Sequence, residues 1–165
     1  MFQYKGGPVQ LDIHPVLTKY LLKLEITDSP DYDYDIHNEE MASPAVYPHA
    51  QTLRLEYFQG YPQVITLDAS SDSQGAYVTV EDVLRTIHED LRKPSSKREL
   101  GTFARGEQTA IRDTFRKRCK SEEERSKGLY RIDYLRGRDR LQILPRHPLD
   151  GTSLPTAAIQ PSNLW

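Results

Sequence analysis

The sequence predicts an α+β protein with a mostly antiparallel sheet of about five strands and two helices on one face of that sheet. Three observations predict this class. Apolar and polar residues alternate near both ends of the chain, two amphipathic stretches lie between these regions, and strands do not alternate regularly with helices. We expect residues 11–144 to form a single domain. Residues 145–165 contain four prolines and no periodicity, so we expect a tail or a surface wrap there.

Period-two alternation of apolar side chains predicts the strands of the first half. They are expected at residues 20–27, 53–58 and 64–67. In the first of these strands Leu22, Leu24 and Ile26 share one face. The second and third strands flank a Gly-Tyr-Pro turn, which predicts a hairpin. Residues 28–50 are acidic and interrupted by prolines, and we expect a long loop there.

The clearest helix is predicted at residues 79–91. Thr79 is the expected N-cap, and Asp82 three residues later completes a capping-box pattern. The apolar residues that share one face of this helix are Val80, Val83, Leu84, Ile87 and Leu91.

A second helix is predicted at about residues 107–127. Its apolar stripe includes Ile111 and Phe115 and ends at Cys119, after which the segment is polar. Gly128 stands where a glycine commonly ends a helix.

A second hairpin is predicted after these helices. Its strands are expected at residues 129–135 and 140–144, joined by a turn. Arg131 and Asp133 lie on the polar face of the first strand. We expect them to pair with each other or with charges on a neighbouring strand, such as Arg54 or Glu56.

Four short motifs follow one another along residues 11–144. They are His14-Pro-Val-Leu17, Val78-Thr-Val-Glu-Asp-Val-Leu84, Phe115-Arg-Lys-Arg118 and Gly128-Leu-Tyr-Arg-Ile-Asp-Tyr-Leu135. Their order and spacing resemble a widespread fungal family of unknown function, whose members pair a VTV-x-DVL helix start with a late G-x-x-R-V-D-F-L strand. The chain departs from the late F-x-G-L strand of that family, where it has Leu141-Gln-Ile-Leu144. The resemblance implies a fold and a fungal context, and it implies no activity, cofactor or catalytic residue.

Cysteine content and hydropathy predict an intracellular protein, cytoplasmic or nuclear, with no membrane partner. The lone Cys119 excludes an internal disulfide and is expected to be a buried structural residue. No apolar run follows the first residues as in a signal peptide, and no stretch approaches the roughly 20 apolar residues of a membrane-spanning helix.

The sequence predicts no metal, no cofactor and no catalytic residue. The run from Asp31 to Asp35 resembles the start of a calcium loop, but Ile36 and Ala42 occupy the positions that require glycine and glutamate. The histidines show no metal-ligand spacing, and no phosphate loop or nucleophile elbow is present. An enzyme with a pocket lined by His88, Tyr130, Asp133 and Tyr134 is left as a third alternative.

Charge is divided along the chain. Residues 1–90 hold 5 Lys/Arg against 15 Asp/Glu, whereas residues 91–146 hold 17 against 8. The basic segment, residues 105–140, predicts a surface that contacts phosphate or nucleic acid, and this is our alternative function. The candidate contacts are Arg112, Arg116, Lys120, Arg136, Arg138 and Arg140. The competing interpretation is that the acidic and basic halves neutralise each other or remain solvated.

The leading prediction is a protein-interaction module without catalytic activity. The long loop and the tail are the expected recognition segments. In the tail Ile159, Leu164 and Trp165 are typical of a short docking segment for a protein partner. They are equally consistent with packing against the sheet of the same domain.

Overall fold

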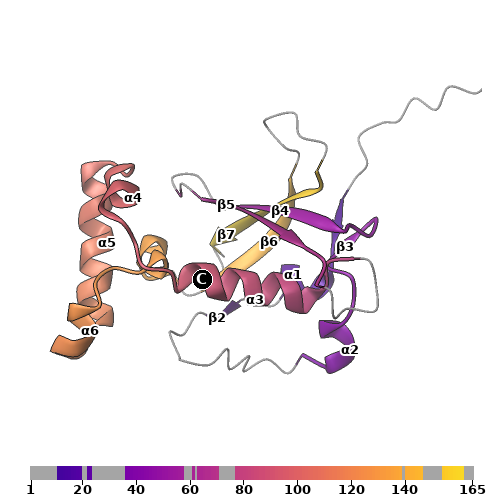
Figure 1. Cartoon of the computed structure of the whole chain (residues 1–165), viewed down its shortest axis with the longest axis horizontal. Coiled ribbons are helices and arrows are strands. Elements are labelled where there is room, and N and C mark those ends of the chain that lie inside the picture. Colours follow the sequence, from indigo (N-terminus) through magenta and orange to yellow (C-terminus); the bar gives the residue numbers. More distant parts are fainter. Residues whose placement is uncertain are drawn as a thin grey trace, which may run out of the picture.

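A mixed β-sheet with one long helix against it forms the larger part of the molecule, and a group of helices stands at one end (Figure 1). The computed structural model describes residues 11–19, 22–23, 36–57, 61, 63–70, 77–138, 140–146 and 154–161. The strands are β1 Asp12–Ile13, β2 Leu22–Lys23, β3 Val46–Tyr47, β4 Thr52–Tyr57, β5 Val64–Asp68, β6 Arg140–Arg146 and β7 Thr156–Pro161. The helices are α1 Pro15–Lys19, α2 Asn38–Met41, α3 Val80–Leu91, α4 Lys97–Gly101, α5 Arg105–Arg118, α6 Glu122–Ser126 and the 3-10 helix η1 Arg131–Leu135. Among the described residues, no helix has both the length and the apolar composition that a membrane crossing requires.

The α+β class is confirmed, but the sheet is mixed rather than mostly antiparallel. Four long strands lie in the order β6-β7-β4-β5, with the two-residue β2 paired to the outer side of β6. β4 and β7 are parallel, and the other pairs of this sheet are antiparallel. β1 and β3 form a separate two-stranded sheet.

The first predicted hairpin is confirmed. β4 pairs with β5 in a register that places Leu53 opposite Leu67 and Leu55 opposite Ile65. Leu53, Leu55 and Tyr57 alternate into the core, as the period-two pattern requires.

The strand predicted at 20–27 and the loop predicted at 28–50 agree less well with the structure. Of the strand expected at 20–27, only β2 falls within the described residues. The loop expected at 28–50 is wrong for its described part, residues 36–50, because α2 and β3 form there.

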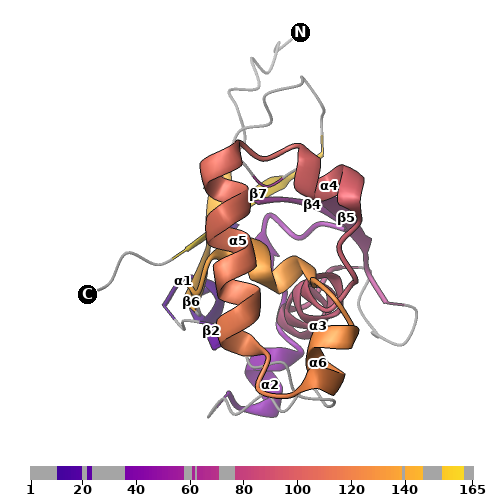
Figure 2. The ribbon, with the colours of Figure 1, turned by 90° about the vertical axis from the view of Figure 1, so that its left-hand side faces the viewer.

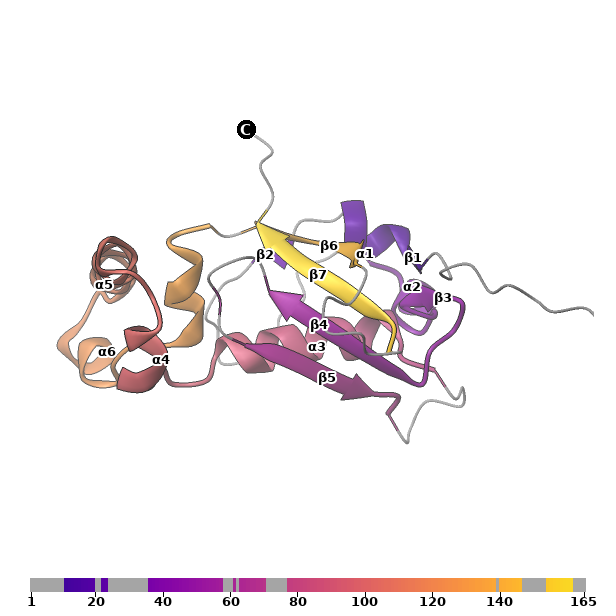
Figure 3. The same cartoon turned by 90° about the horizontal axis from the view of Figure 1, so that it is seen from above.

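The helix α3 begins and runs as predicted. Thr79 Oγ1 accepts a hydrogen bond from the Asp82 amide at 3.1 Å, and the Thr79 amide donates to Asp82 Oδ2 at 3.0 Å. The whole apolar stripe of this helix is buried. α3 lies behind the sheet in Figure 3, so its stripe closes the core against one sheet face.

The second predicted helix is interrupted and does not lie on the sheet. α5 ends at Arg118, Cys119 is extended, and Ser121 starts α6 by accepting a hydrogen bond from the Glu124 amide at 3.1 Å. This Ser-x-x-Glu capping box explains the break, because it favours a new helix start over continuation. α5 packs against η1, so the expectation of two helices on one sheet face holds only for α3. Gly128, at φ 79°, follows the end of α6 in the left-handed conformation that favours glycine.

The strand predicted at 129–135 is wrong, because these residues form η1. The Asp133 carboxylate accepts a hydrogen bond from the Tyr130 amide at 3.0 Å and thereby caps a helical turn. Arg136 and Gly137 then turn the chain with positive φ. The second hairpin is therefore absent, and β6 pairs instead with β2 and β7.

The tail predicted at 145–165 is also wrong over residues 156–161. These residues form β7, which lies between β4 and β6. Ile159 is completely buried opposite Ile143, so the alternative of packing against the sheet holds for this residue. Leu164 and Trp165 lie outside the described residues.

We expect Ile159→Ala to lower the free energy of unfolding by about 2–5 kcal/mol, because it leaves a cavity in the middle of the sheet. Urea denaturation measures this change. Gln160→Ala is the control, since Gln160 is exposed on the same strand and its loss should cost no more than about 0.5 kcal/mol. Equal effects of the two substitutions would contradict the central place of β7.

Candidate functional site

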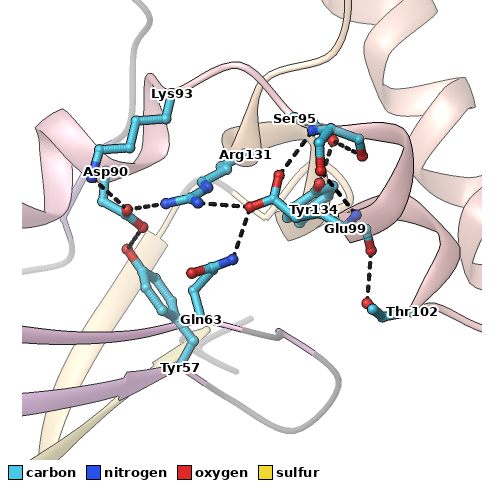
Figure 4. A network of polar contacts seen from close by, with 10 residues as sticks. Tyr57, Gln63, Asp90, Lys93, Ser95, Glu99, Thr102, Arg131 and Tyr134 are labelled. Atoms are coloured by element: carbon cyan, nitrogen blue, oxygen red, sulfur yellow. Dashed lines mark hydrogen bonds and ion pairs between the residues drawn. The ribbon is translucent and has the colours of Figure 1, made fainter.

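An ion-paired arginine joins the helices at the end of the molecule to the sheet. We call residues 95–138, which contain α4, α5, α6 and η1, the helical lobe. Arg131 of η1 contacts Asp90 in the last turn of α3, and its Nη2 lies 2.7 Å from Glu99 Oε1 of α4 (Figure 4). The side chains of Arg131 and Asp90 are 14% and 3% exposed, so these charges depend on each other rather than on water.

Further polar groups complete the carboxylate contacts of this network. The Tyr57 hydroxyl of β4 donates to Asp90 Oδ2 at 3.1 Å, and Lys93 Nζ lies 3.3 Å from Asp90 Oδ1. Gln63, just before β5, donates to Glu99 Oε1 at 2.8 Å. The network therefore connects the sheet with α3, α4 and η1 (Figure 4).

A series of contacting aromatic rings, tilted or edge-to-face, accompanies the network. The ring centroids of Tyr57 and Tyr61 are 4.0 Å apart, those of Tyr61 and Tyr134 are 5.4 Å apart, and Phe103 lies 4.9 Å from Tyr134. Burial raises the pKa of the Tyr57, Tyr61 and Tyr134 hydroxyls above the ordinary value for tyrosine. These ring contacts connect β4 with the helical lobe.

A second arginine is held entirely within the lobe. Arg118 of α5 makes two parallel hydrogen bonds to the buried Asp133 carboxylate, at 2.8 and 2.9 Å. Its guanidinium also lies over the rings of Phe115 and Tyr130, at 5.5 and 5.2 Å from their centroids. Arg118 therefore joins α5 to η1 inside the lobe.

These two arginines correct our expectation for Arg131 and Asp133. Arg131 and Asp133 pair neither with each other nor with the charges of β4. Arg131 binds Asp90 and Glu99, and Asp133 binds Arg118. Glu56 instead lies 3.2 Å from both Arg54 and Arg146. The sequence offers no local signal for these pairings, because the partners of Arg131 are separated from it by 41 and 32 residues.

Two of the four groups proposed for an enzyme pocket are engaged in other contacts. Asp133 is paired with Arg118, and the Tyr134 hydroxyl contacts Ser95 Oγ. Burial lowers the pKa of His88 and raises the pKa of the Cys119 thiol. Among the described residues no group of three or more His, Cys, Asp or Glu side chains is placed to hold a metal ion. The Asp31–Asp35 run lies outside the described residues.

The structure brings together only some of the predicted basic contacts. Arg112 and Arg116 are exposed on α5, whereas Lys120 is exposed beyond the end of that helix. Arg136 is half-buried, with its Nη1 3.5 Å from Glu107 Oε1. Arg138 is exposed in the turn after η1, and Arg140 belongs to β6, where its backbone is paired with Lys23 of β2.

Arg105, Arg112 and Arg116 form the most regular basic surface of the lobe, which we call the α5 arginine stripe. Their separations of seven and four residues are about two turns and one turn, so all three side chains leave one helical face. All three are exposed, and α5 stands in front when the lobe faces the viewer (Figure 2). Arg116 Nη1 lies 3.0 Å from Asp113 Oδ1. Arg105 and Arg112 make no ion pair with any other described residue.

The model of one family, described as a family of unknown function (DUF6699), matches residues 22–151. The chain belongs to this family. No curated protein matches the chain, and no solved structure does.

We expect Arg131→Leu to destabilise the protein by about 3 kcal/mol or more, because it leaves the buried Asp90 carboxylate and Glu99 without their arginine. Chemical denaturation measures the loss. Arg125→Leu removes an exposed pair with Glu122 and should cost about 1 kcal/mol at most. If Arg131→Leu and Arg125→Leu lower the free energy of unfolding by equally small amounts, the Arg131 network does not hold the lobe in place.

We also expect Glu99 to make stability depend on acid. Burial favours a higher pKa for this carboxyl group, but hydrogen bonds from the Ser96 amide and from Arg131 outweigh it and lower the pKa below 4.5. A lowered folded-state pKa contributes stability that is present above pH 4.5 and is lost as the pH falls through the folded-state value. The stability difference between the wild type and Glu99→Gln should therefore shrink in acid.

Unfolding free energies measured between neutral pH and the acid range test this expectation. Glu123→Gln is the matched control, because Glu123 is exposed and lies 3.9 Å from Lys127 Nζ. A wild-type-to-Glu99→Gln difference that stays constant across this range would contradict the assigned role of Glu99.

Proposed function

We propose that this protein is a non-catalytic protein-interaction module whose helical lobe binds an acidic segment of a partner protein. The observation that carries the proposal is the α5 arginine stripe. Arg105 and Arg112 are exposed and make no ion pair with other described residues, so they retain their charge for an outside ligand.

The charge of the whole lobe supports the same partner. Residues 95–138 hold 13 Lys/Arg against 7 Asp/Glu. The most deeply buried of these acids, Asp133, is neutralised within the lobe by Arg118. A positive surface of this kind steers acidic partners toward it and raises their association rate.

The spacing of the stripe indicates the size of the bound segment. The backbone from Arg105 to Arg116 extends about 16 Å along the helix axis. About five residues of extended peptide cover the same distance, since a strand rises about 3.3 Å per residue. A short acidic peptide therefore fits the stripe, as does an acidic helix of about three turns.

An acidic protein is favoured over nucleic acid by the rest of the lobe surface. Proteins bind single-stranded nucleic acid by stacking its bases on exposed aromatic rings. In this lobe Phe103 and Tyr134 are buried, and Tyr130 lies beneath Arg118. Nucleic-acid binding through the candidate cations remains the alternative that the experiment must separate.

Other predictions from the sequence complete the proposal. Leu164 and Trp165 remain candidates for partner docking, whereas Ile159 is a core residue. A fungal origin and a cytoplasmic or nuclear location remain predictions. Among the candidate cations, Arg138 and Lys120 are exposed and extend the basic surface, but Arg136 is engaged by Glu107.

The test is fluorescence anisotropy with a labelled ten-residue glutamate peptide, compared with mixed-sequence RNA and duplex DNA at low and moderate salt. We expect the peptide to bind and the double variant Arg112→Glu/Arg116→Glu to weaken binding about tenfold or more. Each reversed contact removes an attraction of about 0.5–1 kcal/mol and adds a repulsion.

The matched control is Arg125→Glu/Lys127→Glu on α6, which changes the net charge equally. This control should alter the affinity by less than about threefold, since its side chains lie outside the stripe and already pair with Glu122 and Glu123. Tighter binding of RNA or DNA than of the peptide would support the nucleic-acid alternative. Equal losses in the two double variants would show that net charge, and not the stripe, determines binding.

A further inference from the structure

A group of aromatic side chains is exposed at the other end of the molecule. We call Tyr47, Pro48, His49 and Tyr77 the Tyr47 patch. Tyr47 is 64% exposed, Pro48 and His49 are exposed, and Tyr77 is half-buried. Figures 1 and 3 both place β3 at the end of the sheet opposite to the helical lobe. The patch is therefore separate from the α5 arginine stripe.

The rings of the patch contact one another instead of the core. The centroids of Tyr47 and His49 are 5.8 Å apart with the ring planes at 84°, and those of His49 and Tyr77 are 5.2 Å apart at 47°. The first pair is edge-to-face and the second is tilted, and Tyr47 remains largely accessible to a ligand. Tyr47, Pro48, His49 and Tyr77 together form a contiguous exposed aromatic surface, and such surfaces mark interaction sites more often than single exposed rings do.

The backbone holds the patch on a well-connected part of the fold. Val46 is buried, so the strand alternation of β3 turns Tyr47 outward. On one side the His14 amide donates to the Ala45 carbonyl at 2.9 Å, and on the other the Ala45 amide donates to the Val78 carbonyl at 2.9 Å. The Val78 amide donates to the Ala50 carbonyl at 2.8 Å, which keeps Tyr77 beside His49. The rings are thus presented by a fixed backbone.

Carboxylates lie near the patch in the sequence and in the pairing of β1 with β3. The sequence contains no Lys or Arg from Leu24 to Leu53. Asp12 is exposed and lies directly opposite Tyr47 in the pairing of β1 with β3. Glu81 is exposed in the first turn of α3, whose Val80 amide donates to the Ser43 carbonyl at 3.0 Å. Aromatic ring faces and carboxylates together attract a cation.

We propose that the Tyr47 patch binds an arginine or lysine side chain from a basic segment of a partner protein. The cation lies over a tyrosine ring, and the Asp12 carboxylate supplies the counter-charge. The lobe contains an internal example of this contact, where Arg118 lies over the rings of Phe115 and Tyr130 and pairs with Asp133. The proposal does not depend on the acidic ligand of the α5 arginine stripe.

The probe for the test is a ten-residue Gly-Arg repeat peptide, titrated into the protein and followed by NMR and calorimetry. We expect the amide signals of residues 12, 46, 47, 49 and 77 to shift. Tyr47→Ala should weaken binding about threefold to fivefold, because an exposed cation–ring contact is of that strength. Tyr47→Phe should keep the affinity within about twofold, because it preserves the ring.

Val64→Ala is the matched control, since Val64 is 49% exposed on β5 and lies outside the patch. It should leave the affinity unchanged. The proposal is overturned if Tyr47→Ala binds as tightly as the wild type, or if a ten-residue polyproline peptide shifts the same signals more strongly. Salt-sensitive dimers that both Tyr47→Ala and Arg112→Glu abolish would identify the occupant as a second copy of this chain instead. Failure of the glutamate peptide to bind the lobe would leave this result unaffected.

Discussion

The contact of Arg131 with two carboxylates determines how the helical lobe meets the sheet. The lobe lies between α3 and β6 in the sequence. Backbone hydrogen bonds join the segment that enters it to the segment before η1. The Ser95 amide donates to the Leu129 carbonyl at 2.8 Å, and the Arg131 amide donates to the Lys93 carbonyl at 3.0 Å. Arg131 then reaches both Asp90 and Glu99, so one side chain connects α3, α4 and η1. Charges this deeply placed are tolerated only when their partners are in position, which makes the orientation of the lobe specific.

The two arginine clusters of the lobe show how its charge is divided between structure and surface. Arg118 pairs with Asp133, and Arg131 pairs with Asp90 and Glu99, so both arginines serve the structure. The remaining cations of α5 stay outside and face water. The sequence alone shows the basic balance of this region but does not distinguish these two groups, because the distinction depends on long-range partners. Arg116 and Arg118 are only two residues apart, yet Arg116 is exposed and Arg118 is paired with the buried Asp133. The sequence does not distinguish them, because Asp133 lies 15 residues away from Arg118.

The elements that follow from local sequence are the ones that were predicted correctly. Thr79 with Asp82 starts α3, and the alternating residues of β4 and β5 form their hairpin, because each pattern acts within a few residues. The errors arise where alternation is coincidental or weak. Residues 129–135 alternate like a strand, yet Asp133 caps a helical turn. β7 has an apolar run of only three residues, two of them alanine, and Pro155 and Pro161 stand at its ends. Its place in the sheet is therefore set by β4 and β6 rather than by its own propensity.

The position of β7 has a consequence for how the chain assembles. This last strand fills the space between β4 and β6, which come earlier in the chain. During synthesis the two halves of the sheet emerge before the strand that joins them, and each then presents an open edge. Folding must therefore wait for residues separated by about a hundred positions to meet, a topology associated with slow folding. Until β7 has paired with both neighbours, these open edges are sites at which other chains can pair and aggregate.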